Sequence, residues 1–137
     1  LFTCDITEPF HLRQAKIPHD LQTFHVVTAW EVLEHIPEDR LDMLIGNIAT
    51  HLKPGGYFVA SVDTLPDGNL VSDSIYHVTL HDKAWWVRQF ANHQFVEVET
   101  IPFEVEDFVR GNGLTLKDWH PADGDGFHLV LQRLPKS

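Results

Sequence analysis

Two apolar runs separated by a segment of helical periodicity constrain the fold of this chain more than any other feature. The first run, "FHVVTAW" at residues 24–30, is nearly unbroken, as is typical of a strand covered on both faces of a sheet. The second run is "YFVASV" at 57–62. Between them the apolar residues recur every three or four positions, at Leu41, Leu44, Ile45, Ile48 and Leu52. The pattern predicts two parallel strands, near 24–30 and 56–62, joined by a helix near 38–52.

The rest of the chain continues this alternation. Pro37 and the acidic pair after it are typical of a helix start, and "KPGG" at 53–56 is expected to end that helix. A short strand "LFTC" is expected to end at Asp5, and "LPDGNL" at 65–70 is expected to be a turn. "HDKAWWVRQFANH" predicts a second helix with Asp82 as its cap. Two further strands are predicted near 95–101 and 127–133, with a polar linker between them.

Strands that alternate with helices predict an α/β fold with a mostly parallel sheet that is covered on both faces. No convincing helix separates the last two strands, so we expect them to pair antiparallel at an edge of the sheet. Ligands of such sheets bind beyond the carboxyl ends of the strands. This places Asp5, residues 28–31 and residues 61–64 together along one edge, which we call the carboxyl edge.

Composition limits the classes of function. The 137 residues suit a single domain over 1–137, and the formal charge of −10 argues against a nucleic-acid face. No apolar run is long enough to span a membrane, and the single cysteine, Cys4, suits a reducing cytoplasm. The chain begins at Leu1 and its only methionine is Met43, so we expect it to be a piece of a longer protein.

The stretch "HVVTAWEVLEHIPEDRLDMLIGNIATHLKPGGYFVAS" closely resembles the second half of a class I S-adenosylmethionine-dependent methyltransferase. The matching elements are an apolar strand, E-V-L-E-H-I, an amphipathic helix, L-K-P-G-G and a further apolar strand. "CDIT" resembles the preceding strand of that family, and "FHLVLQR" resembles its antiparallel seventh strand. The resemblance implies a partial Rossmann-like class I methyltransferase fold, mostly parallel with an antiparallel last strand.

The chain also departs from that family. Methyltransferases of this class open with a strand and a glycine-rich turn that cradles the methionine end of the cofactor. Here Gly111–Gly113 and Gly124–Gly126 lack a third glycine and sit near the C-terminus, so we interpret them as turns. The second strand of the family is absent too. The resemblance therefore covers the C-terminal two thirds of a methyltransferase domain, without its first two strands.

The resemblance implies a set of cofactor contacts for S-adenosylmethionine. Asp5, with the backbone of Ile6, corresponds to the acidic residue that accepts from the adenine amino group. Ala29 and Trp30 correspond to residues of the fourth strand that pack on the cofactor. The alternative for Asp5 is an ordinary aspartate in a turn at a strand end.

Two residues are candidates for catalysis. Methyl transfer from a sulfonium requires the acceptor to be held in line, and in some enzymes a base that removes its proton. An unperturbed imidazole has a pKa near neutrality, so His35 is the candidate base, with Glu31 next to the reaction centre as hydrogen-bond acceptor or orienter. The alternative is that Glu34 and His35 only mark the turn into the helix, while Glu38 and Asp39 are charges of a helix N-terminus.

The ten histidines raise the question of a metal. His77 and His81 are four residues apart, but no cysteine pair and no H-E-x-x-H motif accompanies them, so no metal is expected. We expect His77 and Trp85 to contact substrate, because their segment follows a strand at the carboxyl edge. Trp86 and Phe90 are expected to belong to the core.

We therefore expect methyl transfer to an oxygen or nitrogen of a small polar metabolite, with a sugar among the candidates. Two alternatives remain open: a truncated, non-catalytic binding or structural module, and a metal-binding domain that would lose zinc or nickel uptake on His77→Ala. The resemblance also implies that the family's first strand would cover the edge of the strand at 24–30. Without it we expect a homo-oligomer, most simply a dimer, or coverage of that edge by the N-terminal segment.

Overall fold

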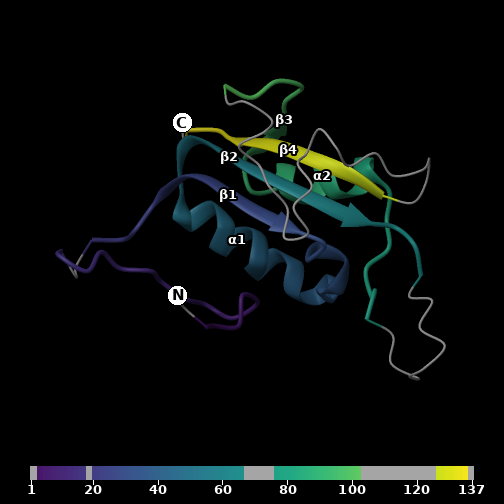
Figure 1. Ribbon diagram of the computed structural model, residues 1–137, viewed down its shortest axis with the longest axis horizontal. Helices are drawn as coiled ribbons and strands as arrows, with labels where there is room; N and C mark the ends of the chain where they lie inside the picture. The colour runs from purple at the N-terminus through teal and green to yellow at the C-terminus, as the bar shows by residue number, and fades with distance from the viewer. Residues whose placement is uncertain (1–2, 18–19, 67–75, 103–125, 136–137) are drawn as a thin grey trace.

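The computed structural model describes residues 3–17, 20–66, 76–102 and 126–135 (Figure 1). Its regular elements, in chain order, are β1 (Phe24–Trp30), α1 (Leu41–His51), β2 (Leu52–Asp63), α2 (Lys83–Ala91), β3 (Phe95–Glu97) and β4 (Gly126–Arg133). Two single turns of 3-10 helix, η1 (Leu33–His35) and η2 (Glu38–Arg40), connect β1 to α1. The predicted alternation of strands and helices, and the helix expected over 38–52, are confirmed.

The four strands form one sheet in the order β1-β2-β4-β3. β1 and β2 pair in parallel, and β4 pairs antiparallel with both β2 and β3. Three strands therefore run in one direction and β4 runs against them, which confirms the mostly parallel sheet with an antiparallel last strand. The last two strands do pair antiparallel as predicted. However, β4 lies inside the sheet, because it also pairs with β2 from Tyr57–Gln132 to Asp63–Gly126.

The core lies between the sheet and its two helices. Directly paired residues of β2 and β4, such as Phe58 with Leu131 and Ala60 with Leu129, point to one face. These side chains form one buried cluster with Leu44 of α1 and with the large aromatic residues of α2. Both of the described helices therefore pack on the same face of the sheet. On the opposite face of β2, Val59 and Ser61 are also fully buried. The core positions predicted for Trp86 and Phe90 are confirmed, since both are fully buried.

The passage from α1 to β2 differs from the prediction. The helix does end just before "KPGG", at His51, but β2 already begins at Leu52 and not near residue 56 as predicted. Leu52 already pairs with Phe24, and the register then shifts before the next pair, Val26–Tyr57. The segment is thus a bulge inside β2. Gly56 permits it, because a Cβ there would lie 2.9 Å from a backbone carbonyl oxygen of β1.

The N-terminal segment does not form the strand expected to end at Asp5: residues 3–5 have no strand conformation in the structure, and residues 1–2 lie outside the described part. The segment instead runs along α1 (Figure 1), where Asn47 donates hydrogen bonds from its side-chain amide to the carbonyl oxygens of Ile6 and Glu8, at 2.9 and 3.0 Å. Pairing with a helix side chain replaces pairing with a strand.

The second helix and the third strand follow the sequence with small differences. Asp82 caps α2 as predicted, since its side chain accepts a hydrogen bond from the Trp85 amide at 2.8 Å. β3 is shorter than the predicted 95–101, although the Val98 amide still bonds to Val130 of β4. Most of the turn expected at 65–70, and the glycines and linker between 103 and 125, lie outside the described residues. No helix in the described part is long and apolar enough to cross a membrane.

Candidate functional site

The carboxyl edge of β1 and β2 holds Glu31 in a defined position. Glu31 has a φ of 52°, a left-handed conformation that costs a non-glycine residue about 1–3 kcal/mol. Ser61 of β2 stabilises it, because the Glu31 amide donates to the Ser61 hydroxyl at 3.1 Å and that hydroxyl donates to a Glu31 carboxylate oxygen at 2.5 Å. The sequence predicted both residues at this edge, but not the bond between them.

A cavity of about 530 Å³ lies between the end of β1, the N-terminal segment and α1. Three of the four predicted cofactor contacts, Ile6, Ala29 and Trp30, line this cavity. Its other walls include Phe10, Leu44 and Ile48, so most of its surface is apolar. Such a volume and lining are typical of small-molecule sites in proteins.

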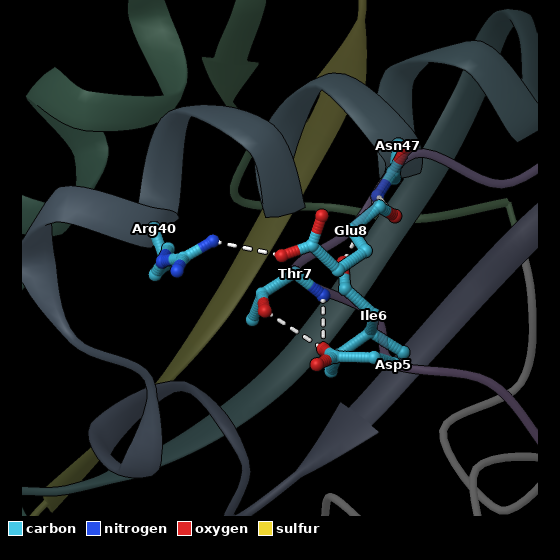
Figure 2. A network of polar contacts seen from close by, with 6 residues as sticks. All are labelled: Asp5, Ile6, Thr7, Glu8, Arg40 and Asn47. Carbon is cyan, nitrogen blue, oxygen red and sulfur yellow. Dashed lines mark hydrogen bonds and ion pairs between the residues drawn. The ribbon is translucent and has the colours of Figure 1, made fainter.

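The fourth predicted cofactor contact, Asp5, does not line the cavity. Figure 2 shows its carboxylate turned toward Thr7, whose amide and hydroxyl both donate to Asp5 Oδ1, at 2.9 and 2.7 Å. The bonds from the Thr7 side chain and backbone lower the pKa of Asp5 from its ordinary value. Asp5 is therefore an exposed, ionised carboxylate next to the cavity, in the turn that the alternative interpretation described.

Asn47 is a site residue that the sequence analysis missed. It is buried in α1, and its two bonds to the N-terminal segment hold Ile6 against the cavity (Figure 2). An ion pair of 2.8 Å between Arg40 and Glu8 lies beside it, with both side chains about half exposed, so it adds little stability. An asparagine on the apolar stripe of the predicted helix was the available signal.

The second candidate catalytic residue, His35, lies in η1 next to the chain segment at 76–79. The Glu34 carbonyl accepts hydrogen bonds from the amides of Val78 and Thr79, at 2.9 and 3.1 Å. The Nδ1 atom of His35 lies 2.9 Å from the Tyr76 carbonyl oxygen. These bonds bring His77 beside His35, with ring centroids 4.8 Å apart. Residues 41 and more apart in sequence thus meet at the carboxyl edge.

Glu34 is the other residue whose importance the sequence did not show. Its side chain is fully buried, and neither carboxylate oxygen has a hydrogen-bond partner. Burial, and to a smaller extent the nearby charge of Glu31, raises the pKa of Glu34 from 4.5 to about 7, against an opposing effect of the backbone amides of Glu34 and Asp63. One oxygen of Glu34 and one ring nitrogen each of His35 and His77 lie within 4.8 Å of one another. We call these three residues the Glu34–His35–His77 cluster.

The two predicted substrate contacts have different surroundings. His77 belongs to the cluster, whereas Trp85 stacks on His81 with ring centroids 3.8 Å apart. His81 in turn bonds to Glu38 at 2.7 Å. The pair of histidines that first suggested a metal, His77 and His81, is therefore not the pair that the structure brings together.

Comparison with known proteins places the chain in a family. A family model for a methyltransferase domain matches residues 3–114. Among solved structures, the chain is similar to an S-adenosylmethionine-dependent methyltransferase from Clostridium acetobutylicum ATCC 824, with a TM-score of 0.60 and 10% identity, over 96% of this chain and 63% of that one. No curated protein sequence matches it.

Two N-methyltransferases share the fold. The glycopeptide N-methyltransferase MtfA, in complex with S-adenosyl-L-homocysteine, gives a TM-score of 0.53 at 15% identity, over 96% of this chain and 59% of that one. NodS from Bradyrhizobium japonicum WM9 gives 0.50 at 14%, over 96% and 58%. The chain thus spans between 58% and 63% of the length of these three structures. The family model covers most of the sequence, and the sheet is mostly parallel with an antiparallel last strand, as predicted. The chain therefore belongs to the class I methyltransferases.

Proposed function

We propose that this chain is part of an S-adenosylmethionine-dependent methyltransferase that acts on an oxygen or nitrogen of a small polar metabolite. The main observation behind the proposal is a cavity at the carboxyl edge, which is lined by Ile6, Ala29 and Trp30 and lies beside Glu31. Two of the similar structures are N-methyltransferases, so nitrogen remains a candidate for the methyl acceptor atom, together with oxygen. A sugar remains among the candidate acceptors.

The residues around the cavity fit the cofactor. The apolar walls formed by Ile6, Ala29 and Trp30 suit a flat adenine ring, and the exposed carboxylate of Asp5 beside them is a hydrogen-bond acceptor for its amino group. When bound, S-adenosylmethionine supplies a methyl group already activated on a sulfonium. This chain's own residues then hold the cofactor, orient the acceptor and remove its proton where the acceptor carries one.

His35 is our candidate for proton removal and Glu31 for orientation. A carbonyl oxygen only accepts hydrogen bonds, so the contact with Tyr76 places the proton of His35 on Nδ1. Nε2 is then the basic nitrogen. The Ser61 hydroxyl fixes the Glu31 carboxylate, which can accept a hydrogen bond from the acceptor. His77 and Trp85 remain proposed substrate contacts on the acceptor side.

The cofactor proposal is tested by adding S-adenosylhomocysteine to the isotopically labelled chain at millimolar concentration and recording amide chemical shifts. We expect the shifts to move at Ile6, Ala29 and Trp30 and to stay constant on β3. A control with methionine alone should leave the shifts at Ile6 unchanged. Movement confined to residues outside the cavity would refute the assignment and favour the non-catalytic module.

The catalytic roles are tested in a longer enzyme that contains this chain. Glu31→Ala and His35→Ala should each lower turnover by about 100-fold, within the usual contribution of a positioned acid or base, while unfolding free energies change much less. Full activity in both variants would mean that these two residues have no catalytic role and belong only to the turn that leads into α1.

We also propose where the enzyme acts and in what form. The exposed thiol of Cys4 suits the reducing cytoplasm, and we propose that the enzyme acts there as a homo-oligomer.

A further inference from the structure

The Glu34–His35–His77 cluster contains a carboxylate whose burial the rest of the fold does not explain. Glu34 is 0% exposed, and both of its side-chain oxygens are without hydrogen-bond partners. An unpaired carboxylate in such surroundings costs several kcal/mol unless it is protonated, paired or bound to a metal. Within the described part of the chain, the imidazoles of His35 and His77 are the neighbouring groups that suit a bound metal.

Both imidazoles make the backbone contact that metal-binding histidines commonly make. Nδ1 of His35 faces the Tyr76 carbonyl oxygen at 2.9 Å, and Nδ1 of His77 faces the Leu65 carbonyl oxygen at 2.7 Å. A carbonyl can only accept, so each Nδ1 carries the proton and each Nε2 has its lone pair. Histidine ligands in proteins generally donate their second nitrogen to a backbone carbonyl or a carboxylate, which fixes the tautomer in this way.

The spacing is also suitable. One oxygen of Glu34 and one ring nitrogen of each histidine lie within 4.8 Å of one another, and ligands about 2.0–2.2 Å from a tetrahedral ion are about 3.4 Å apart. Small side-chain rotations close this difference, because His35 is exposed and His77 only partly buried. The backbone beneath them is already fixed by the two amides of Val78 and Thr79 that bond to the Glu34 carbonyl.

Charge favours a cation at this position. Glu31 lies close enough for its negative charge to raise the pKa of Glu34, and the whole chain carries a formal charge of −10. A divalent ion between the side chains would relieve the repulsion between these two carboxylates and give the Glu34 oxygens a partner. The alternative is a neutral, protonated Glu34 with no ion.

We propose that Glu34, His35 and His77 bind one divalent transition-metal ion at the carboxyl edge, with zinc as the best match. Imidazole and carboxylate donors suit zinc, whereas magnesium and calcium prefer oxygen donors alone. Three protein ligands leave a position open for water or for an oxygen or nitrogen of a second molecule, as in catalytic rather than structural sites. The proposal departs from the sequence-based expectation that no metal binds.

The site stands independently of the proposed methyl transfer, but it changes the role of His35. One Nε2 cannot both bind a metal and accept a proton. With the metal in place His35 is a ligand, and a hydroxyl group or water in the open position has its pKa lowered by the ion instead. Metal binding is measured without cofactor or acceptor, so a failure of either proposal leaves the other testable.

The test is a titration of the chelator-treated chain with zinc, in competition with a chromophoric zinc indicator. We expect one tight site per chain, and an affinity at least about tenfold lower in Glu34→Gln and in His77→Ala. His25→Ala is the matched control, because this histidine is exposed on β1 outside the cluster, and it should keep the tight site. Circular dichroism of each variant verifies its fold.

Cobalt substitution gives a second readout. Co²⁺ in the site should produce the intense visible absorption of a four-coordinate ion, and Glu34→Gln should abolish it while the protein stays folded. Tight binding that is unchanged in both Glu34→Gln and His77→Ala would overturn the proposal, as would the absence of any tight site in the unmodified chain. Either result would assign Glu34 to the protonated, metal-free state.

Discussion

β1 and β2 are neighbouring parallel strands of similar apolar composition, but they differ in how deeply their side chains are buried. Residues 58–62 of β2 are completely buried. By contrast, every residue of β1 is at least partly exposed, and Phe24 is exposed to 36%. β2 has a strand on each side, whereas β1 pairs only with β2 among the described residues. The strand predicted at 24–30 is therefore confirmed, but its side chains are less completely covered than the unbroken apolar run predicts.

The comparison separates stability from function in this chain. The side of the sheet formed by β2, β4 and α2 contains most of the buried core, including the ring stack of Phe58 on Phe90, with centroids 5.1 Å apart. The side formed by β1 and the end of β2 contains the cavity and the Glu34–His35–His77 cluster. Mutations on the two sides should accordingly have different consequences.

The largest effect is expected from the core. Phe58→Ala should lower the free energy of unfolding by about 3–5 kcal/mol, because it removes a fully buried ring and leaves a cavity. Val27→Ala on β1, which pairs directly with Phe58, should lower it by about 1 kcal/mol, since Val27 is only partly buried. Urea unfolding measures both. Equal losses would mean that β1 is as well covered as β2.

The next effect concerns Glu34 and pH. Burial raises the pKa of Glu34 to about 7 in the folded chain, against 4.5 for the unfolded side chain. The folded state therefore keeps a proton that the unfolded state loses between these values, so stability should fall as pH rises from about 4.5 to about 7. The loss at pH 8 should reach about 3 kcal/mol, since each pKa unit is worth about 1.4 kcal/mol.

Glu34→Gln tests this pH dependence directly. In the presence of a chelator the variant should be more stable than the unmodified chain at pH 8 and equally stable near pH 4, because the amide cannot ionise. Glu38→Gln serves as the control, because Glu38 is an exposed carboxylate of η2. It should change the free energy of unfolding little, both at pH 8 and near pH 4. A flat pH profile in the unmodified chain would show that Glu34 is not desolvated as the structure indicates.

The sequence was sufficient for most of the fold and only partly for the site. Periodicity located β1, α1 and α2, because apolar stripes and runs are local properties. Glu31, Ala29 and Trp30 were placed at the carboxyl edge because topology alone fixes where strands end. Asn47 and Glu34 were missed, since their importance depends on burial against segments 39 or more residues away. Nothing local distinguishes a buried glutamate from a helix-start charge.

A smaller effect is expected for the cofactor. The chain of 137 residues contains no glycine-rich turn of the kind that cradles the methionine end, so it should bind S-adenosylmethionine weakly through the adenine side of the cavity alone. Calorimetry at micromolar protein concentration should detect little or no heat. A low-micromolar dissociation constant would show that the β1 side provides more of the site than the family resemblance implies.

The smallest effect concerns association through β1. The described part of the N-terminal segment runs along α1 and does not pair with β1, so of the two ways to cover this edge, self-association is the one left to test. An exposed apolar edge strand recruits a second strand, and the repulsion from the net charge is screened over about 8 Å at physiological salt. Light scattering should therefore detect a dimer that dissociates on dilution.

Phe24→Lys places a charge on the exposed edge of β1 and should shift the equilibrium from dimer toward monomer, whereas Phe24→Leu should not. A particle that stays monomeric at the highest accessible concentration would mean that the outer edge of β1 is protected in solution, and the contrast between β1 and β2 would then be smaller than their exposures indicate.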